Sequence, residues 1–322
     1  MKILVAPLNW GLGHASRCVP LIQRFLDEGH EVILGGDGES LTLLKRHFPT
    51  LRYTYLAPLN LRYSKGSRQV WAMLKAIPKL LAWALKDHAM LKALLREEQI
   101  DQIISDNRFG LYNKATECVY MTHQLHIMLP KGWKWAEKIA LRMHARIYAR
   151  FNKVWVPDYE EKEKSLAGEL SHQGDVRRND VRCTIEYIGP LSRFERAIDR
   201  ESERSGDFDV VAVLSGLEPH RTLLEKEILA RYQDTDERVL IVQGLMHRPN
   251  VRIKRANFTI VPTMHDAELA QALSGAKHII ARSGYSTIMD LHALGILDKA
   301  ELIPTPGQPE QEYLATLIDK MH

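Results

Sequence analysis

Short apolar runs and amphipathic helical segments alternate along the whole chain of 322 residues. In the first half, runs rich in Val, Ile and Leu occur at 2–7, 31–37, 102–106, 118–123 and 153–158. The segments between them place apolar residues three or four positions apart, as in Val19, Ile22 and Leu26. This alternation is typical of β-α-β units, which build a parallel sheet covered by helices on both faces.

The same pattern starts again near residue 208, after a polar stretch at 160–182 and a charged stretch at 195–207 that is typical of a surface linker. A chain of this length exceeds one ordinary compact domain. We therefore predict an α/β protein made of two doubly wound, Rossmann-like parallel-sheet domains that face a cleft. The predicted boundaries are 1–195 and 206–322.

The composition excludes several other classes of protein. Hydrophobic residues make up 45% of the chain and charged residues 26%, which is typical of a globular protein. The three cysteines, Cys18, Cys118 and Cys183, match no zinc or disulfide spacing and predict buried thiols in a reducing cytoplasm. A net charge of +4 does not indicate nucleic acid by itself, and no nucleic-acid recognition motif is present.

A glycine-rich turn follows the first apolar run, with Gly11, Gly13 and His14 in the sequence GLGH. Such a turn lets the backbone approach a ligand, and the helix N-terminus after it favours an anion. The third glycine of the dinucleotide fingerprint is absent, so a plain tight turn is the alternative. The helix dipole disfavours a charged imidazole, so we expect a neutral His14 able to accept a proton; a satisfied turn or core histidine is the alternative.

Three further turns follow predicted strands of the second half. They contain Ser215 and Gly216, then Ser283 and Gly284, and finally the stretch 304–315. Because the carboxyl ends of parallel strands lie at one edge of a sheet, where open α/β sheets bind ligands, these turns predict one binding crevice.

These motifs together resemble the GT-B glycosyltransferases, in particular the N-acetylglucosaminyltransferase that makes lipid II. Its relatives read GGxGGH after the first strand, RSGAxTxxE in the second domain and QQxxNA near the end. This chain has GLGH at 11–14, LSG at 214–216, RSGYSTIMD at 282–290 and QEYLA at 311–315.

The resemblance implies a role for each matching residue. Asp290 would hold the ribose diol of UDP, the two serine–glycine turns would cradle the diphosphate, and Met264 would lie beside the uracil. Gln311 and Glu312 would contact the sugar. The set predicted to bind a UDP-sugar is Gly11, Gly13, Ser215, Gly216, Met264, Arg282, Ser283, Gly284, Asp290, Gln311 and Glu312.

The resemblance also implies an inverting transfer that needs no metal and no cofactor, with the UDP-sugar as co-substrate. His14 is the candidate base and Asp106 the candidate residue that orients it, as in the plant UDP-glycosyltransferases of this fold. A turn-forming aspartate before Asn107 is the alternative for Asp106. The acidic pair at 234–236 lies in a polar stretch and predicts a solvated loop, not a metal site.

A basic amphipathic segment spans 131–153. Lys134, Lys138, Arg142, Arg146 and Arg150 recur every fourth residue beside an apolar stripe of Trp135, Ile139, Met143, Ile147 and Phe151. Such a helix can lie on an anionic membrane, which predicts a lipid-linked or glycan acceptor and a cytoplasmic protein peripheral to the inner membrane face. The alternative is a helix that packs on the first sheet with its basic face in water.

Two other functions remain open from the sequence. The stretch GLGHASRC resembles GxGHxxRC of the UDP-sugar hydrolase in pseudaminic acid synthesis, in which water would replace the acceptor. A non-catalytic subunit that binds a nucleotide sugar is the other alternative.

Overall fold

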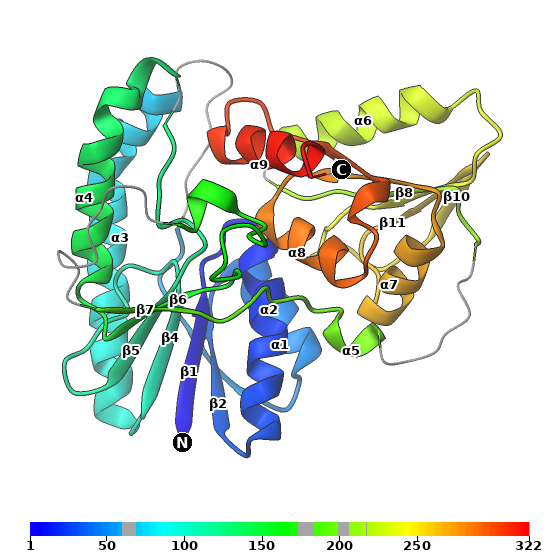
Figure 1. Cartoon of the computed structure of the whole chain (residues 1–322). Helices are drawn as coiled ribbons and strands as arrows, with labels where there is room; N and C mark the ends of the chain where they lie inside the picture. Colours follow the sequence, from blue (N-terminus) through cyan, green and yellow to red (C-terminus); the bar gives the residue numbers. More distant parts are fainter. Residues whose placement is uncertain (60–68, 130, 173–182, 199–205, 217, 322) are drawn as a thin grey trace. The chain divides into compact units, whose positions relative to one another are not determined.

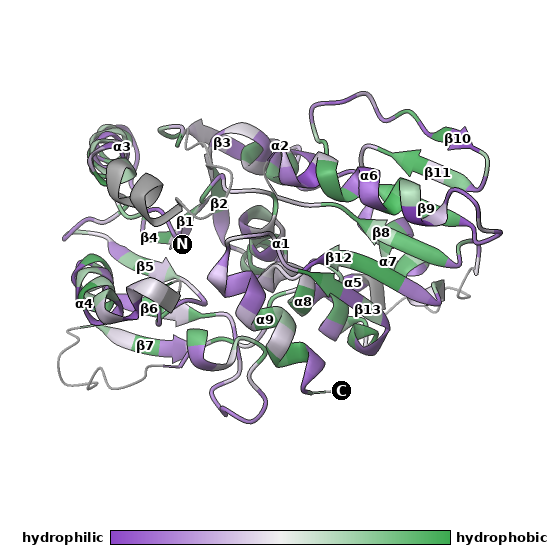
Figure 2. Ribbon diagram, turned by 90° about the horizontal axis from the view of Figure 1, so that it is seen from above, coloured by the Kyte–Doolittle hydropathy of each residue, from purple (hydrophilic) through white to green (hydrophobic). Residues whose placement is uncertain are grey.

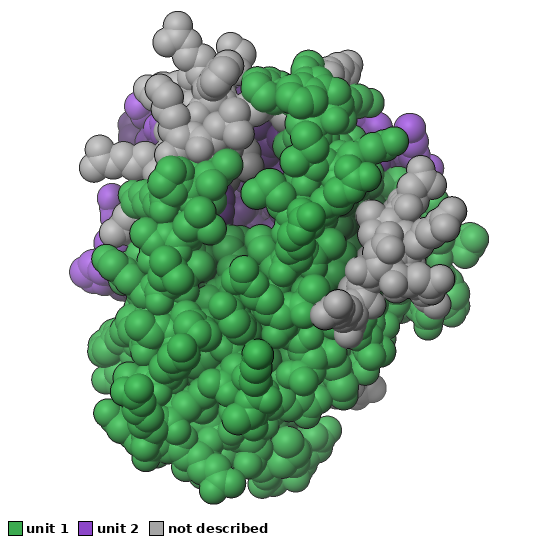
Figure 3. Space-filling model, turned by 90° about the vertical axis from the view of Figure 1, so that its left-hand side faces the viewer, with its two compact units in different colours: residues 1–9, 18–191 green, residues 10–17, 192–322 purple. Residues whose placement is uncertain are grey.

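The computed structural model describes the chain except for residues 60–68, 130, 173–182, 199–205, 217 and 322. The chain forms two compact units (Figure 3). Unit 1 comprises Met1–Asn9 and Cys18–Leu191, and unit 2 comprises Trp10–Arg17 and Ser192–His322. The GLGH turn therefore belongs to unit 2, although the strand before it belongs to unit 1.

Unit 1 contains a seven-stranded sheet in the order β3-β2-β1-β4-β5-β6-β7, with every neighbouring pair parallel. The strands are β1 (Lys2–Pro7), β2 (Glu31–Gly36), β3 (Arg52–Tyr55), β4 (Gln102–Asp106), β5 (Glu117–Met121), β6 (Lys153–Val156) and β7 (Thr184–Tyr187). The chain runs outward from β1 to β3 and then returns to β4 on the other side of β1. This reversal makes the carboxyl ends of β1 and β4 the topological switch point of the sheet.

Helices cover both faces of this sheet (Figures 1 and 2). One face carries α1 (Gly13–Asp27) and α2 (Gly38–His47), and the other carries α3 (Gln69–Glu97) and α4 (Glu137–Tyr148), which follows the 3-10 helix η1 (Lys131–Ala136). Leu91 of α3 and Tyr148 of α4 pack with Leu4 and Ile103 of the sheet in one core. Apolar runs become central strands because both of their faces are buried by helices.

Unit 2 contains a six-stranded sheet in the order β10-β11-β9-β8-β12-β13, parallel except for β10 against β11. The strands are β8 (Val210–Val213), β9 (Val239–Val242), β10 (Ile253–Arg255), β11 (Phe258–Val261), β12 (His278–Arg282) and β13 (Ala300–Ile303). The helices are α5 (Glu195–Ile198), α6 (His220–Tyr232), α7 (Asp266–Gly275), α8 (Tyr285–Ala293) and α9 (Pro309–Asp319). Leu224 and Ile228 of α6 pack on Val210 and Ile241 of the sheet.

The predicted α/β class with two parallel-sheet units is confirmed. The structure passes from unit 1 to unit 2 between Leu191 and Ser192. In the predicted linker, 195–198 forms the short helix α5 of unit 2, whereas 199–205 lies outside the described residues.

Candidate functional site

Arg282 joins three of the predicted turns of unit 2. It is the last residue of β12, so its side chain starts at the carboxyl end of the sheet. Nη2 donates to the carbonyl of His220 at 2.8 Å, at the start of α6, and Nη1 donates to the carbonyl of Pro304 at 3.1 Å, just after β13. One guanidinium therefore holds the loops that follow β8, β12 and β13.

The Arg282 side chain is buried with carbonyl groups as its hydrogen-bond partners. The residue is 5% exposed, and its Nε atom has no hydrogen-bond partner among the described residues. No carboxylate of the described part of the chain forms an ion pair with it; burial lowers the pKa of Arg282, and the charge of Glu227 opposes that shift. A buried cation without an ion-pair partner is unfavourable, so an anion here would stabilise the site.

The start of α8 lies directly after Arg282. The first amides of a helix lack intrahelical partners, and the helix dipole makes this end attractive to anions. Ser283 is fully buried and its hydroxyl donates to the carbonyl of Gln311 at 2.8 Å, which ties the start of α8 to α9. Gly13 lies against the same turn: a Cβ on Gly13 would be 2.3 Å from Oγ of Ser286. The site therefore combines a buried cation with a helix N-terminus that a bare glycine approaches.

Ser215, Gly216 and Met264 lie on two other loops of unit 2. Ser215 is half-buried after β8, and Gly216 is exposed with a φ of +91°, which a side chain would strain. Met264 is half-buried between β11 and α7. Gly11 also has a positive φ, of +80°, within the segment of unit 2 that precedes α1. The glycines at 11 and 216 thus allow turns that other residues resist.

Gln311 and Glu312 hold the turn after β13. Oε1 of Gln311 accepts from the amide of Thr305 at 2.8 Å, and Oε1 of Glu312 accepts from the amide of Gly307 at 3.3 Å. Because the Gln311 oxygen faces the loop, its amide NH₂ group is directed away from that bond.

Asp290 is buried in α8, and each of its carboxylate oxygens already accepts a hydrogen bond. Ser192 donates to Oδ1 at 2.7 Å, and Nε of Arg193 donates to Oδ2 at 3.2 Å. Arg193 also pairs with Asp266 of α7 at 3.3 Å. Burial raises the pKa of Asp290, and Arg193 opposes that rise. Neither Ser192 nor Arg193 was predicted as a site residue, because both lie in the stretch before the predicted linker.

The two predicted catalytic residues belong to different units. Nη2 of Arg17 lies 2.9 Å from Nδ1 of His14, in unit 2. A guanidinium only donates hydrogen bonds, so Nδ1 accepts, and the proton of a neutral His14 ring is on Nε2. Asp106 ends β4 in unit 1, is fully buried, and faces the thiol of Cys18 at 3.8 Å.

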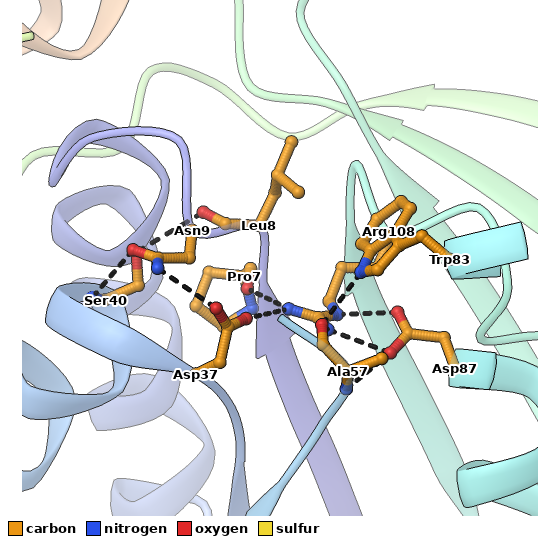
Figure 4. Close-up of polar contacts among 9 residues, drawn as sticks. All are labelled: Pro7, Leu8, Asn9, Asp37, Ser40, Ala57, Trp83, Asp87 and Arg108. Carbon is orange, nitrogen blue, oxygen red and sulfur yellow. Dashed lines mark hydrogen bonds and ion pairs between the residues drawn. The ribbon is translucent and has the colours of Figure 1, made fainter. Parts of the chain in front are cut away.

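A second buried arginine, Arg108, lies at the carboxyl edge of unit 1 (Figure 4). Its Nε and Nη2 bind the two oxygens of Asp87, both at 2.9 Å, and its Nη1 binds Asp37 at 2.8 Å. The carbonyls of Ala57 and Pro7 accept from Nη2 and Nη1 at 2.7 and 3.4 Å. All five N–H donors of this guanidinium therefore have protein partners.

The network continues from Asp37 toward the segment that follows β1. Nδ2 of Asn9 donates to Oδ2 of Asp37 at 3.0 Å, and Oδ1 of Asn9 accepts from the amide of Ser40 at 3.3 Å. Burial raises the pKa of Asp87, although Arg108 opposes that rise. This network was not predicted from the sequence because its members come from five separate segments.

The α4 region exposes much of the predicted apolar stripe. Trp135, Ile139 and Met143 are 70%, 51% and 49% exposed, and Trp133 stacks beside Trp135. The buried face of α4 is formed instead by His144 and Tyr148. The alternative in which the apolar stripe packs on the sheet does not hold for its first three members, because the helix turns a different face to the core. Apolar and hydrophilic residues alternate along α4 in Figure 2.

No three His, Cys, Asp or Glu side chains of the described residues are grouped closely enough to hold a metal ion. Among the helices that the structure describes, none is both long and apolar enough to cross a membrane.

Comparisons with known proteins agree with this fold. No protein-family model matches the chain. A protein of Methanosarcina acetivorans described as an uncharacterized glycosyltransferase is 24% identical over 338 residues, which cover 99% of this chain and 84% of that protein.

Solved glycosyltransferases share the fold at lower identity. The spinosyn rhamnosyltransferase SpnG is 15% identical with a TM-score of 0.59, and the match covers 98% of this chain and 84% of SpnG. UGT2 of Phytolacca americana, complexed with UDP-2-fluoroglucose and pterostilbene, is 15% identical with a TM-score of 0.57, over 99% of this chain and 83% of UGT2. The GT-B fold predicted from the sequence is confirmed, and the predicted enzyme class is the class to which both sets of matches belong.

Proposed function

We propose that the protein is a glycosyltransferase that takes its sugar from a UDP-sugar. The observation that carries this proposal is the buried Arg282 guanidinium, which has no counter-ion in the described structure and lies beside the N-terminus of α8. A nucleotide diphosphate supplies the negative charge that this arrangement favours. UGT2 is complexed with a UDP-sugar, and SpnG has been solved with thymidine diphosphate, so two proteins of this fold bind nucleotide diphosphates.

The remaining predicted residues of unit 2 complete the donor site. Ser215, Gly216 and Gly284 bind the diphosphate through backbone amides and a hydroxyl, and Met264 contacts the base. Asp290 binds the ribose hydroxyls through the lone pairs that Ser192 and Arg193 leave available on its oxygens.

The sugar is bound at the last of these loops. The amide NH₂ group of Gln311 and the exposed Glu312 carboxylate contact it, with UDP-N-acetylglucosamine as the proposed donor. Gly11 and Gly13 let the backbone of their turn approach this ligand.

His14 is the proposed base, with Asp106 as its orienting carboxylate. The acceptor oxygen forms a bond to the anomeric carbon, the bond from that carbon to the diphosphate breaks, and UDP leaves with the electron pair. The acceptor proton passes to His14. Its lone pair is on Nδ1, the atom that Arg17 contacts, so the reaction requires Arg17 to release that atom. Attack from the opposite face inverts the anomeric centre, and the step uses no metal and no cofactor.

The proposed acceptor is lipid-linked or a glycan, reached at an anionic membrane surface on the inner face. This part rests on segment 131–153, in which Trp135, Ile139 and Met143 are exposed beside the basic side chains of Lys134, Lys138 and Arg142. Exposed apolar residues flanked by lysine and arginine bind membranes by burial and charge together.

The function is tested by following UDP release from UDP-N-acetylglucosamine with and without dodecyl maltoside, an alkyl glycoside, as acceptor. Transfer to the glycoside that is lost in His14→Ala supports the proposal. Equal UDP release without the acceptor identifies a hydrolase, and UDP binding without turnover identifies a binding subunit. The donor site is tested with Asp290→Ala, which we expect to lose UDP binding, and with Ser192→Ala, which keeps the carboxylate and should retain it.

The membrane proposal has a separate test, co-sedimentation with vesicles. We expect binding to vesicles rich in phosphatidylglycerol and not to pure phosphatidylcholine vesicles. The variant Trp135→Ser/Ile139→Ser/Met143→Ser should lose that binding. Leu81→Ser/Leu85→Ser changes two equally exposed residues of α3 and serves as the matched control. Equal binding of both variants and the wild type would contradict the assignment to α4.

A further inference from the structure

Asn107 follows β4 in a backbone conformation that few residues adopt. Its φ is +58°, in the left-handed region, where asparagine is tolerated better than most side chains but still at a cost. Within the described residues, Ala256 is the one other non-glycine residue with a positive φ. Strain of this kind is retained where the surrounding structure enforces it, and such positions cluster at functional sites.

The residues on both sides hold Asn107 rigidly. Asp106 is fully buried, and its carbonyl accepts from the amide of Leu8 at 2.9 Å. Arg108 is fully buried in the ion-pair network described above, and its carbonyl accepts from the Ser105 hydroxyl at 2.6 Å. Asn107 is therefore the apex of a short turn whose two flanks are both fixed in the core.

A buried hydrogen-bond chain also fixes the orientation of the Asn107 side chain. The hydroxyl of Tyr120 donates to Oδ1 of Asn107 at 2.8 Å, and Nε2 of His144 lies 3.4 Å from the same hydroxyl. Because the Tyr120 proton points to Asn107, Nε2 of a neutral His144 donates to the Tyr120 oxygen. Burial lowers the pKa of His144 to about 4, which keeps that ring neutral.

This chain leaves one end open. With its oxygen held by Tyr120, Asn107 presents its NH₂ group on the opposite side, and Nδ2 has no partner among the described residues. The residue is half-buried and lies at the carboxyl end of β4, at the topological switch point of unit 1. The buried Nδ1 of His144 also lacks a partner among the described residues, which lowers stability. The chain that orients Asn107 is therefore kept at the expense of some stability.

We infer that Asn107 binds an oxygen of the acceptor substrate through its amide NH₂ group, with Tyr120 and His144 as positioning residues. This inference rests on the proposed function for the identity of its ligand. The chemistry recognised is an oxygen acceptor of hydrogen bonds, which either a sugar hydroxyl or a phosphate of a lipid-linked acceptor supplies. Open α/β sheets bind ligands at the switch point, where this NH₂ group lies.

The test follows the side-chain amide of Asn107 by NMR in the full chain labelled with ¹⁵N-asparagine. The Asn107 signals are those missing from Asn107→Asp, which keeps the shape and removes both donors. The protein is titrated separately with inorganic phosphate and with methyl β-D-glucopyranoside. We expect the Asn107 signals to shift with one of them, which identifies the oxygen as that of a phosphate or of a hydroxyl.

Three variants sharpen the result. Asn107→Gly accommodates the positive φ without the side chain, and its affinity for the same ligand should fall at least tenfold. Tyr120→Phe removes the orienting hydroxyl, and we expect the Asn107 NH₂ signals to move in the free protein, which a structural role alone would not produce. Asn113→Asp is the matched amide-to-carboxylate control and should bind as the wild type does. If neither ligand shifts the Asn107 signals, the inference is overturned.

UDP binding, measured by calorimetry on the same samples, separates this inference from the proposed function. Loss of the Asn107 response with intact UDP binding overturns only the acceptor site. An Asn107 response in a protein that binds no UDP overturns the proposed function and retains the oxygen-binding site.

Discussion

Arg108 in unit 1 and Arg282 in unit 2 are both buried near the carboxyl end of a parallel strand, but their partners differ. Arg108 has two aspartates and two carbonyls, and every N–H donor is used. Arg282 has carbonyl partners only, and its Nε is unpaired in the described structure. The first guanidinium is already neutralised by two carboxylates, whereas the second forms no ion pair within the described residues. We therefore infer that Arg108 stabilises the fold, whereas Arg282 binds a ligand.

The largest expected effect is on Arg108. Replacement by Met leaves the Asp37 and Asp87 carboxylates buried without their cation, so we expect the free energy of unfolding to fall by about 4 kcal/mol. Urea unfolding followed by circular dichroism measures this. The triple variant Arg108→Met/Asp37→Asn/Asp87→Asn, which removes all three charges, should recover part of that loss. If the free energy of unfolding of Arg108→Met fell by less than about 1 kcal/mol, Arg108 would not differ from Arg282 in its contribution to stability.

The next effect comes from His144 of unit 1, the buried end of the hydrogen-bond chain that runs through Tyr120 to Asn107. Burial lowers its pKa from the usual 6.5 to about 4, so the unfolded chain binds the proton more readily than the folded one. Above pH 6.5 the neutral ring makes its full contribution to the free energy of unfolding. As the pH falls from 6.5 to 4, that free energy decreases by about 3 kcal/mol. Unfolding of the wild type and of His144→Leu across this range measures it. Equal pH dependence in the two proteins would contradict the prediction.

The smallest effect concerns Arg231, an arginine on the surface of unit 2. It pairs with Glu301 at 2.7 Å with its side chain 48% exposed. An exposed ion pair contributes little, so Arg231→Gln should lower the free energy of unfolding by less than about 1 kcal/mol and leave UDP binding unchanged. A strong loss of UDP affinity in this variant would show that removal of any arginine from unit 2 disturbs the site.

The sequence predicted the sheets and most turns of unit 2 because each depends on local patterns. Apolar runs of strand length and glycines at turns with positive φ, such as Gly11 and Gly216, are visible residue by residue. Arg282 was found through the motif around it, without a sign that it would lack a counter-ion.

The missed features depend on residues that meet only after folding. From the sequence alone, Arg108 is a charged residue in a loop. Its partners Asp37 and Asp87 lie in other segments and meet it only in the folded chain. Periodicity alone could not decide which face of α4 is buried, because that depends on the sheet against which His144 and Tyr148 pack. Ser192 and Arg193 gain their role only beside Asp290.

The measurement that tests the account most directly pairs UDP calorimetry with urea unfolding of Arg282→Met, with Arg231→Gln as the control. We predict that Arg282→Met lowers the affinity for UDP at least tenfold, which is about 1.4 kcal/mol, while the free energy of unfolding without UDP changes by about 1 kcal/mol or less. A variant that binds UDP as the wild type does, but loses several kcal/mol of stability, would contradict the account. Arg282 would then be a structural arginine like Arg108.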